Sequence, residues 1–198
     1  MFFFSLGQKR VENTFSSLLD VDGTEKSSQA DIELKLINFY RSLFSKDILD
    51  MQLWEELIYD LDTCLTDYEH DLCEGLFMKE ELFTALLGLQ TGKSGGSDGL
   101  PPGFYSAFWD DLSDSLLSVL NECYNTSSLN LSQCQALLHL FYKKVDRPLP
   151  KNWHPISLMN TDYKLASKII TKSLKKVMTS IVHLDQMCGV VGSCIFAN

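Results

Sequence analysis

The sequence has little of what marks secreted, metal-binding or membrane proteins. None of its six cysteines forms a CxxC pair, so they lack the spacing of a disulfide framework or of a structural zinc site, and reduced cysteines are expected. No apolar run approaches the roughly 20 residues that cross a bilayer, and the apolar start at residues 1–6 is too short for a signal peptide. We therefore expect an intracellular protein, in the cytoplasm, the nucleus or both, with no membrane partner.

Positive charge is also scarce, with 17 Lys+Arg against 26 Asp+Glu and a net charge of -9. The scarcity is confined to one part of the chain. Residues 1–142 carry 8 Lys+Arg and 23 Asp+Glu, whereas residues 143–198 carry 9 and 3, which gives net charges of -15 and +6. Since phosphate repels acidic surfaces, we expect only the C-terminal part to face nucleic acid.

Hydrophobic residues make up 45% of the chain, enough to bury a core, and their spacing is mostly helical. The pattern predicts helices over residues 30–44, 51–60, 77–90, 101–109, 112–124 and 161–182. It predicts a hairpin over 14–24 and a pair of strands over 136–142 and 155–159. The predicted fold class is α+β and predominantly α-helical.

The helix over 161–182 separates apolar and basic residues. At about 100° per residue one stripe is apolar: Ala166, Ile170, Leu174, Val177 and Ile181. The opposite side is basic: Lys164, Lys168, Lys172, Lys175 and Lys176. A solvated face is the ordinary interpretation of such lysines. Because only Asp162 opposes them within this helix, a nucleic-acid backbone is the alternative interpretation.

Two short motifs suggest phosphate chemistry. The stretch from Leu18 to Thr24 matches the DxDGT signature of haloacid-dehalogenase-type phosphatases, in which Asp20 would be the nucleophile and Asp22 the general acid beside Mg²⁺. An Asp-Gly hairpin turn is the commoner explanation, and no alternating strand–helix pattern follows. A P-loop around Lys93 is excluded for two reasons. A P-loop requires a glycine six positions before its lysine, where this chain has Leu87, and it follows a strand, whereas this loop follows a predicted helix.

Other possible sites are weaker still. Asp110-Asp111 is superficially similar to the acidic pair of polymerases, but it lies between helical segments instead of on a strand hairpin. His139 lies in an apolar strand and is predicted to pack in the core. Cysteines and histidines near Cys73 or Cys188 lack zinc-site spacing. We expect no metal ligands.

Five segments, taken in order, resemble the reverse transcriptases of LINE-type (non-LTR) retrotransposons. Residues 18–44 look like the segment between endonuclease and polymerase, and residues 92–109 are similar to GKSPGPDGLPxEFYxxFW. Residues 129–146 are similar to LPLSxxxAxxxLLPKKGD, and residues 151–165 to KNWRPISLLNTDYKIL. Residues 185–198 are similar to DQTGFVPGRSIxxN. Each segment alone is a weak match, but all five in the family's order are specific.

The resemblance implies a helical N-terminal extension over 1–75 and a partial reverse transcriptase domain over 76–198, with the fingers, a small antiparallel β element and the start of the palm. The catalytic aspartates of the family lie in later palm segments. This chain is therefore expected to be catalytically inactive alone, with no cofactor, Mg²⁺ being needed only by the intact enzyme. The expected partner is RNA or a primer-template, bound weakly; the oligomeric state is left open.

The resemblance and the charge pattern together give two sets of candidate binding residues, none of them catalytic. The predicted nucleotide or phosphate contacts are Lys143, Lys144 and His154. The predicted nucleic-acid contacts are Lys93, Lys151, Lys168, Lys172 and Lys175. His154 departs from the family, which has an arginine there, and a neutral imidazole cannot replace a fixed bidentate charge. A non-catalytic helical interaction scaffold is the alternative function.

Overall fold

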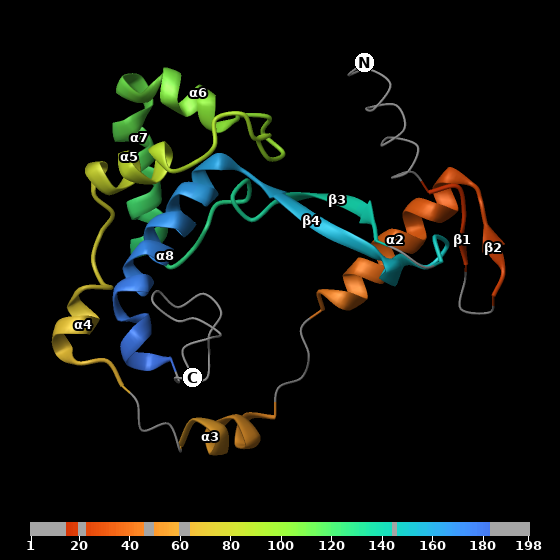
Figure 1. Cartoon of the computed structure of the whole chain (residues 1–198), viewed down its shortest axis with the longest axis horizontal. Helices are drawn as coiled ribbons and strands as arrows, with labels where there is room; N and C mark the ends of the chain where they lie inside the picture. Colours follow the sequence, from red (N-terminus) through yellow and green to blue (C-terminus); the bar gives the residue numbers. More distant parts are fainter. Residues whose placement is uncertain (1–14, 20–22, 46–49, 60–63, 144–145, 183–198) are drawn as a thin grey trace, which may run out of the picture. The chain divides into compact units, whose positions relative to one another are not determined.

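The chain forms two compact units, and its secondary structure is mostly helical (Figure 1). The computed structural model describes five stretches of the chain: residues 15–19, 23–45, 50–59, 64–143 and 146–182. Unit 1 comprises residues 1–50 and 138–157, and unit 2 comprises residues 51–137 and 158–198. The predicted α+β, predominantly helical class is confirmed. Among the described residues, no helix has both the length and the apolar character of a membrane span.

Unit 1 contains a hairpin at the predicted place, but its second strand lies just beyond the predicted range of 14–24. Strand β1 (Leu18–Leu19) pairs antiparallel with β2 (Glu25–Lys26), and Leu18 lies opposite Lys26. The turn residues 20–22 lie outside the described part of the chain. Leu18 is fully buried, so this short pair contributes apolar surface to the core of unit 1.

The first long helix of unit 1 is α2 (Gln29–Leu43), one residue from the predicted boundary at each end. It begins after Ser28, whose Oγ accepts a hydrogen bond from the backbone N–H of Asp31 at 3.2 Å. This N-cap satisfies one of the N–H groups that the first helical turn leaves free. Ile32 and Tyr40 are the buried residues of the helix, and burial raises the pKa of the Tyr40 hydroxyl.

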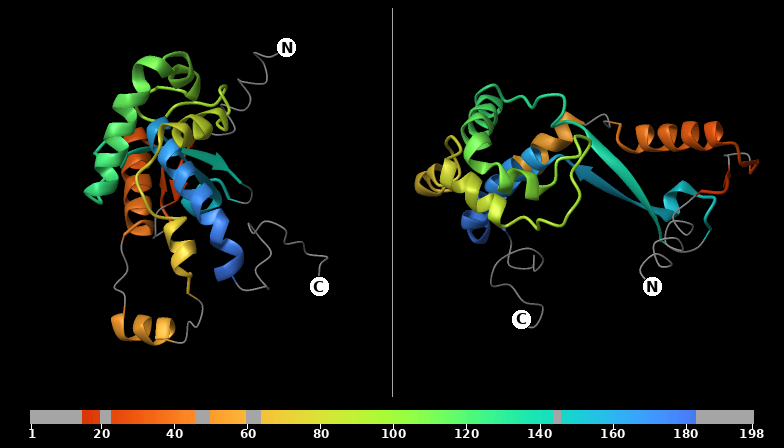
Figure 2. Two further views of the ribbon diagram at one scale, coloured as in Figure 1. Left: turned by 90° about the vertical axis from the view of Figure 1, so that its left-hand side faces the viewer. Right: turned by 90° about the horizontal axis from the view of Figure 1, so that it is seen from above.

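A second two-stranded sheet consists of β3 (Ala136–Tyr142) and β4 (Trp153–Met159), which run antiparallel (Figure 2). The prediction for β3 is confirmed, and β4 begins two residues earlier than predicted. Trp153 explains the earlier start, because its ring is buried and stacks on Phe15 with 3.8 Å between ring centroids. Its Nε1 donates a hydrogen bond to Arg147 O at 2.8 Å. Trp153 thus fixes the beginning of β4.

Unit 2 is built from helices. Those in its described part are α3 (Met51–Tyr59), α4 (Asp67–Asp71), α5 (Lys79–Leu87), α6 (Pro102–Ala107), α7 (Trp109–Asn125) and α8 (Thr161–Ile181). The sequence predicts all of them except the short α4. The buried core cluster lies among α5, α6, α7 and α8. Leu82, Leu86, Leu120 and Leu165 are at most 1% exposed within it, and each such leucine contributes roughly 1.5–3 kcal/mol by leaving water.

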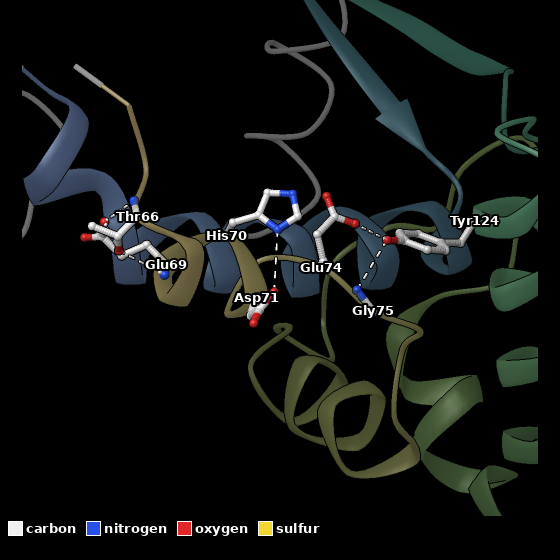
Figure 3. Close-up of polar contacts among 7 residues, drawn as sticks. All are labelled: Thr66, Glu69, His70, Asp71, Glu74, Gly75 and Tyr124. Atoms are coloured by element: carbon white, nitrogen blue, oxygen red, sulfur yellow. Dashed lines mark hydrogen bonds and ion pairs between the residues drawn. The ribbon is translucent and has the colours of Figure 1, made fainter. Parts of the chain in front are cut away.

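Helix α4 is capped at its start by reciprocal hydrogen bonds (Figure 3). Thr66 Oγ1 accepts from the N–H of Glu69 at 3.3 Å, and Glu69 Oε2 accepts from the N–H of Thr66 at 3.0 Å. This capping box explains how a five-residue helix persists. Glu69 also accepts a hydrogen bond from Ser180 of α8, and this bond, with those from Thr66, lowers the pKa of the Glu69 carboxyl.

The segment after α4 is tied to α7 through Tyr124 (Figure 3). The Tyr124 hydroxyl donates to Glu74 Oε2 at 2.6 Å and accepts from the N–H of Gly75 at 3.3 Å. Gly75 has a φ of +117°, which suits glycine and few other residues. These contacts hold the chain between α4 and α5 against the end of α7.

The apolar stripe predicted on α8 is only partly buried. Ala166 and Val177 are in the core, but Ile170 and Leu174 are 48% and 45% exposed. The buried side of α8 is instead centred on Leu165 and Ile169, because the helix packs mainly against α5. An apolar stripe read from one helix does not show which neighbouring helix covers it.

The prediction that His139 packs in the core is wrong. His139 is exposed, and its ring lies 4.6 Å from that of Phe141 between centroids. Most of β3 is exposed, including Leu137 and Leu138. The apolar sequence of β3 does not show that the strand is buried, because burial requires other elements to cover it.

Candidate nucleic-acid interface

The structure distributes the predicted site residues over both units. Lys143, Lys151 and His154 belong to unit 1, whereas Lys93 and the lysines of α8 belong to unit 2. Lys144 lies outside the described residues. Each unit therefore carries its own candidate surface.

In unit 2, a hollow of about 210 Å³ lies between α5 and α8 and brings three of the predicted lysines together. Lys168, Lys172 and Lys175 line it from α8, and Glu81 lines it from α5. Lys172 and Lys175 are exposed. Three ammonium groups against one carboxylate make this hollow electropositive, although the whole chain carries a net charge of -9.

Sequence reasoning missed the other residues of the hollow. Its floor is apolar, because Ala85 and Ile169 are 5% and 4% exposed. Thr84 and Thr171 add hydroxyl groups to its walls. No sequence signal could have found these partners of the lysines, because three of the five, Glu81, Thr84 and Ala85, come from α5, which is distant in sequence.

Two lysines of α8 already bind backbone carbonyl groups. Lys168 Nζ donates a hydrogen bond to the carbonyl of Gly88, the residue that ends α5. Lys164 Nζ donates to Ser94 O at 3.2 Å. A cation at a helix C-terminus is favourable because the helix dipole is negative there. Lys164 and Lys168 thus attach α8 to the end of α5 and to the following loop, which leaves Lys172 and Lys175 as the more available cations.

The glycine-rich loop over residues 92–99 packs tightly on the start of α8. A β-carbon placed on Gly95 would lie 2.7 Å from Leu100 O. A β-carbon on Gly96 would lie 2.5 Å from Met159 C and closer still to Asn160. Real β-carbons do not approach other atoms this closely. Gly95 therefore permits the tight fold of the loop against Leu100, and Gly96 permits the contact between the loop and the start of α8.

Buried polar side chains fix the same contact. Asn160 is 1% exposed; its Oδ1 accepts from the N–H of Asp98 at 3.3 Å, and its Nδ2 donates to Ser132 O at 3.0 Å. Thr161 Oγ1 donates to Leu100 O at 2.7 Å. Buried polar groups with partners of this kind stabilise one unique arrangement.

Lys93, a predicted contact, lies in the exposed part of this loop together with Gly92 and Ser94. Its backbone N–H donates to Gln90 O at 3.2 Å in the turn that follows α5. The loop therefore follows a helix, as the sequence predicts, and a P-loop would follow a strand. Lys93 remains a cation at the surface of unit 2.

The junction of the loop and α8 is also electrostatically unusual. Burial, together with the negative charges of Asp162 and Asp98, raises the pKa of the Tyr105 hydroxyl to about 12. Tyr105 is 8% exposed and belongs to the core cluster. Its hydroxyl is therefore neutral at physiological pH.

In unit 1, the candidate residues lie around the turn between β3 and β4. Lys143 is exposed, and its backbone N–H donates to Asn152 O at 3.1 Å. The short 3-10 helix η1 (Pro150–Asn152) carries Lys151, which is exposed. His154 is exposed beside the buried Trp153, so its side chain is accessible to a ligand.

Arg147 is a cation of unit 1 that sequence reasoning did not select. Its guanidinium lies over the ring of Tyr142, 4.7 Å from the centroid, which is a cation–π arrangement. This contact with Tyr142 is visible only in the structure, because nothing in the sequence around Arg147 indicates it.

The alternative motifs find no support in the described residues. Asp20 and Asp22 of the phosphatase motif lie outside them, and the hairpin at Leu18 is antiparallel, whereas the motif needs the parallel sheet of a Rossmann-like fold. Asp110 and Asp111 are exposed in the first turn of α7. Across the described part of the chain, no three or more His, Cys, Asp or Glu side chains gather closely enough to hold a metal ion.

No protein-family model matches the chain. A comparison with known proteins finds 36% identity over 198 residues to the "Transposon TX1 uncharacterized 149 kDa protein" of Xenopus laevis. The match covers 100% of this chain and 15% of the TX1 protein. The chain is similar along its whole length to a transposon protein.

The similarity to the TX1 protein includes both candidate surfaces, because it covers the entire chain. It supports the transposon origin that the sequence resemblance predicts. The name of the TX1 protein states no activity, and this chain spans about one seventh of its length.

Proposed function

We propose that this chain is a fragment of a LINE-type retrotransposon RNA-directed DNA polymerase that binds RNA or a primer-template weakly. The full-length similarity to a transposon protein supports the origin, and the five ordered segments support the reverse transcriptase assignment. The observation that carries the binding proposal is the hollow with Lys168, Lys172 and Lys175 on one side and a single carboxylate, Glu81, on the other. Clustered ammonium groups bind phosphates by releasing condensed counterions.

The same proposal holds that the chain alone does not polymerise DNA. A polymerase needs two carboxylates on a strand hairpin to hold its metal ions, whereas Asp110 and Asp111 begin helix α7. In an intact enzyme of this family, Mg²⁺ would be held by residues outside this chain. Lys143, Lys144 and His154 would then contact the nucleotide or template without taking part in catalysis.

Binding is tested by fluorescence anisotropy with labelled single-stranded RNA at several salt concentrations. The logarithm of the affinity should fall linearly with the logarithm of the salt concentration, by roughly 0.7 per phosphate contact. Changing Lys168, Lys172 and Lys175 together to Gln should reduce this slope by roughly 2. A control that removes two charges outside the hollow changes Lys26 and Lys176, half-exposed and exposed lysines, to Gln, and should reduce the slope by less than roughly two thirds of the effect of the triple variant. Affinity that does not depend on salt contradicts the proposal.

Polymerisation is tested by primer extension with Mg²⁺ or Mn²⁺ and all four deoxynucleotides. We expect no template-dependent product above a preparation that lacks the protein. Incorporation that follows the template sequence would show that the chain is a complete polymerase and would overturn this part of the proposal.

The apolar groove between α7 and α8 favours a second candidate function, a non-catalytic helical scaffold. The groove has a volume of about 490 Å³, and Phe77, Leu120, Leu129 and Ile170 contribute to its lining. If the chain self-associates through this groove, light scattering will show assembly that increases with protein concentration. Ile170→Glu should abolish the assembly, because a carboxylate cannot be buried there without a partner, and should leave RNA binding intact.

A further inference from the structure

The two threonines in the hollow of unit 2 use their hydroxyl hydrogens within their own helices. Thr84 Oγ1 donates to Glu80 O at 2.7 Å, and Thr171 Oγ1 donates to Ser167 O at 2.7 Å. A hydroxyl has one hydrogen and two lone pairs. Each threonine therefore presents only a hydrogen-bond acceptor to a ligand in the hollow.

The lysines of the hollow have the opposite character. Lys172 and Lys175 are exposed ammonium groups, which donate and cannot accept. Lys168 is half-exposed and donates to Gly88 O. One wall of the hollow thus offers positively charged donors, and the threonines offer neutral acceptors.

A ligand that suits both the lysines and the threonines must combine anionic oxygens with a hydroxyl donor. The phosphodiester group of a nucleic-acid backbone supplies acceptors, but it has no donor for the threonines. A ribose phosphate supplies both, because its 2′-OH donates while its phosphate accepts, and deoxyribose lacks this hydroxyl. The buried side chains of Ala85 and Ile169 form an apolar floor on which the carbon face of a sugar can rest.

The size of the hollow favours part of a polymer over a free nucleotide. Its volume of about 210 Å³ is below the roughly 300–1,000 Å³ of pockets that enclose whole small molecules. It lies open at the surface, since Thr84, Thr171 and both outer lysines are exposed. A chain of nucleotides can therefore pass across it while one sugar phosphate occupies it.

We propose that the hollow between α5 and α8 binds one ribose phosphate of an RNA strand and distinguishes RNA from DNA. Lys172 and Lys175 bind the phosphate, and the oxygen of Thr84 or Thr171 accepts a hydrogen bond from the 2′-OH. This assignment rests on the proposed nucleic-acid binding and adds a site and a sugar preference to it.

Glu81 determines which end of the sugar phosphate faces α5 and which end faces α8. Its Oε2 accepts from the N–H of Met78 at 3.1 Å, which holds the carboxylate at the start of α5. A phosphate next to this carboxylate would be repelled. The phosphate therefore lies on the α8 side, and the sugar lies between it and α5.

The test compares three labelled oligonucleotides of one sequence: RNA, DNA and 2′-O-methyl RNA. Full-length chain is titrated into each at constant salt, and affinity is measured by fluorescence anisotropy. RNA should bind roughly 2- to 10-fold more tightly than DNA, the effect of one neutral hydrogen bond. The 2′-O-methyl RNA should bind no more tightly than DNA, because its methyl group removes the donor.

Paired variants assign the preference to the hollow. Thr84→Val with Thr171→Val should lower RNA affinity to that of DNA and leave DNA affinity unchanged. Thr84→Ser with Thr171→Ser keeps both hydroxyls and should keep the preference. Lys172→Gln with Lys175→Gln should weaken RNA and DNA alike, whereas Lys176→Gln should do so less, since Lys176 is on the same helix but does not line the hollow. Circular dichroism checks that each variant is folded.

The possible failures are distinguishable. If the chain binds neither RNA nor DNA, the proposed function fails, and this inference fails with it. If it binds both equally, or if the valine pair keeps the RNA preference, only the site assignment fails. If AMP alone binds as tightly as the oligonucleotide and the valine pair abolishes that binding, a free nucleotide is the ligand and the RNA assignment is overturned.

Discussion

Gly96 lies in direct contact with Asn160, at the point where the glycine-rich loop meets the start of α8. A β-carbon at position 96 would overlap the Asn160 side chain and backbone and would lie 2.5 Å from Met159 C. Asn160 in turn holds the loop through the N–H of Asp98 at 3.3 Å. The loop that carries Lys93 and the helix that carries the other candidate lysines of unit 2 are thus one packed structure.

We expect Gly96→Ala to destabilise the protein by about 1–3 kcal/mol, the usual cost of overpacking a tight site. Gly92→Ala in the same loop is the matched control, because a β-carbon there would meet no atom within 4 Å; its effect should stay within roughly 0.5 kcal/mol. Urea denaturation followed by circular dichroism measures both. Equal stability of the two variants would show that the loop is not packed on α8.

Lys168→Gln should lower the free energy of unfolding, because it removes the hydrogen bond to Gly88 O at the end of α5. The expected loss is about 0.5–1.5 kcal/mol, since partial exposure to water limits a charge-assisted bond. Lys172→Gln removes the same charge from an exposed position and should change stability by less than roughly 0.5 kcal/mol. Thermal unfolding of the two variants compares them. A larger loss for Lys172→Gln would contradict the assigned roles.

The stability of the protein should fall at alkaline pH because of Tyr105, whose pKa is raised to about 12 in the folded state by burial, Asp162 and Asp98. In the unfolded chain a tyrosine has a pKa of about 10. The buried neutral hydroxyl therefore favours the folded state fully below pH 10 and progressively less as the pH rises to about 12, by at most roughly 1.4 kcal/mol per pH unit. Tyr105→Phe should flatten the dependence in this window. If the two slopes coincide, Tyr105 does not titrate as described.

His154→Arg should strengthen nucleic-acid binding and steepen its salt dependence by roughly 0.7, as expected for one added phosphate contact on a single strand. Asn38→Arg, on the exposed part of α2 in the same unit, adds the same charge as a control. Anisotropy at several salt concentrations gives both slopes. If Asn38→Arg has an equal effect, the gain at position 154 is only long-range attraction.

The organisation of the chain into an extension over 1–75 and a partial polymerase domain over 76–198 stays a prediction. The two compact units do not coincide with this division of the chain. Unit 1 combines residues 1–50 with residues 138–157. Trp153 shows why: it stacks on Phe15, which is far away in sequence. Such a contact has no local signal in the pattern of hydrophobic residues.

The sequence by itself determined the described helices except α4, the β3–β4 pair, the approximate place of the first hairpin and the basic side of α8, because periodicity, glycine clusters and capping residues act over a few neighbouring positions. Only the tertiary structure decided which lysines of that side are engaged. Lys164 and Lys168 bind Ser94 and Gly88, whereas Lys172 and Lys175 remain over the hollow. Their partners come from α5 and its following loop, and an angle on one helix contains no information about the helix that packs against it.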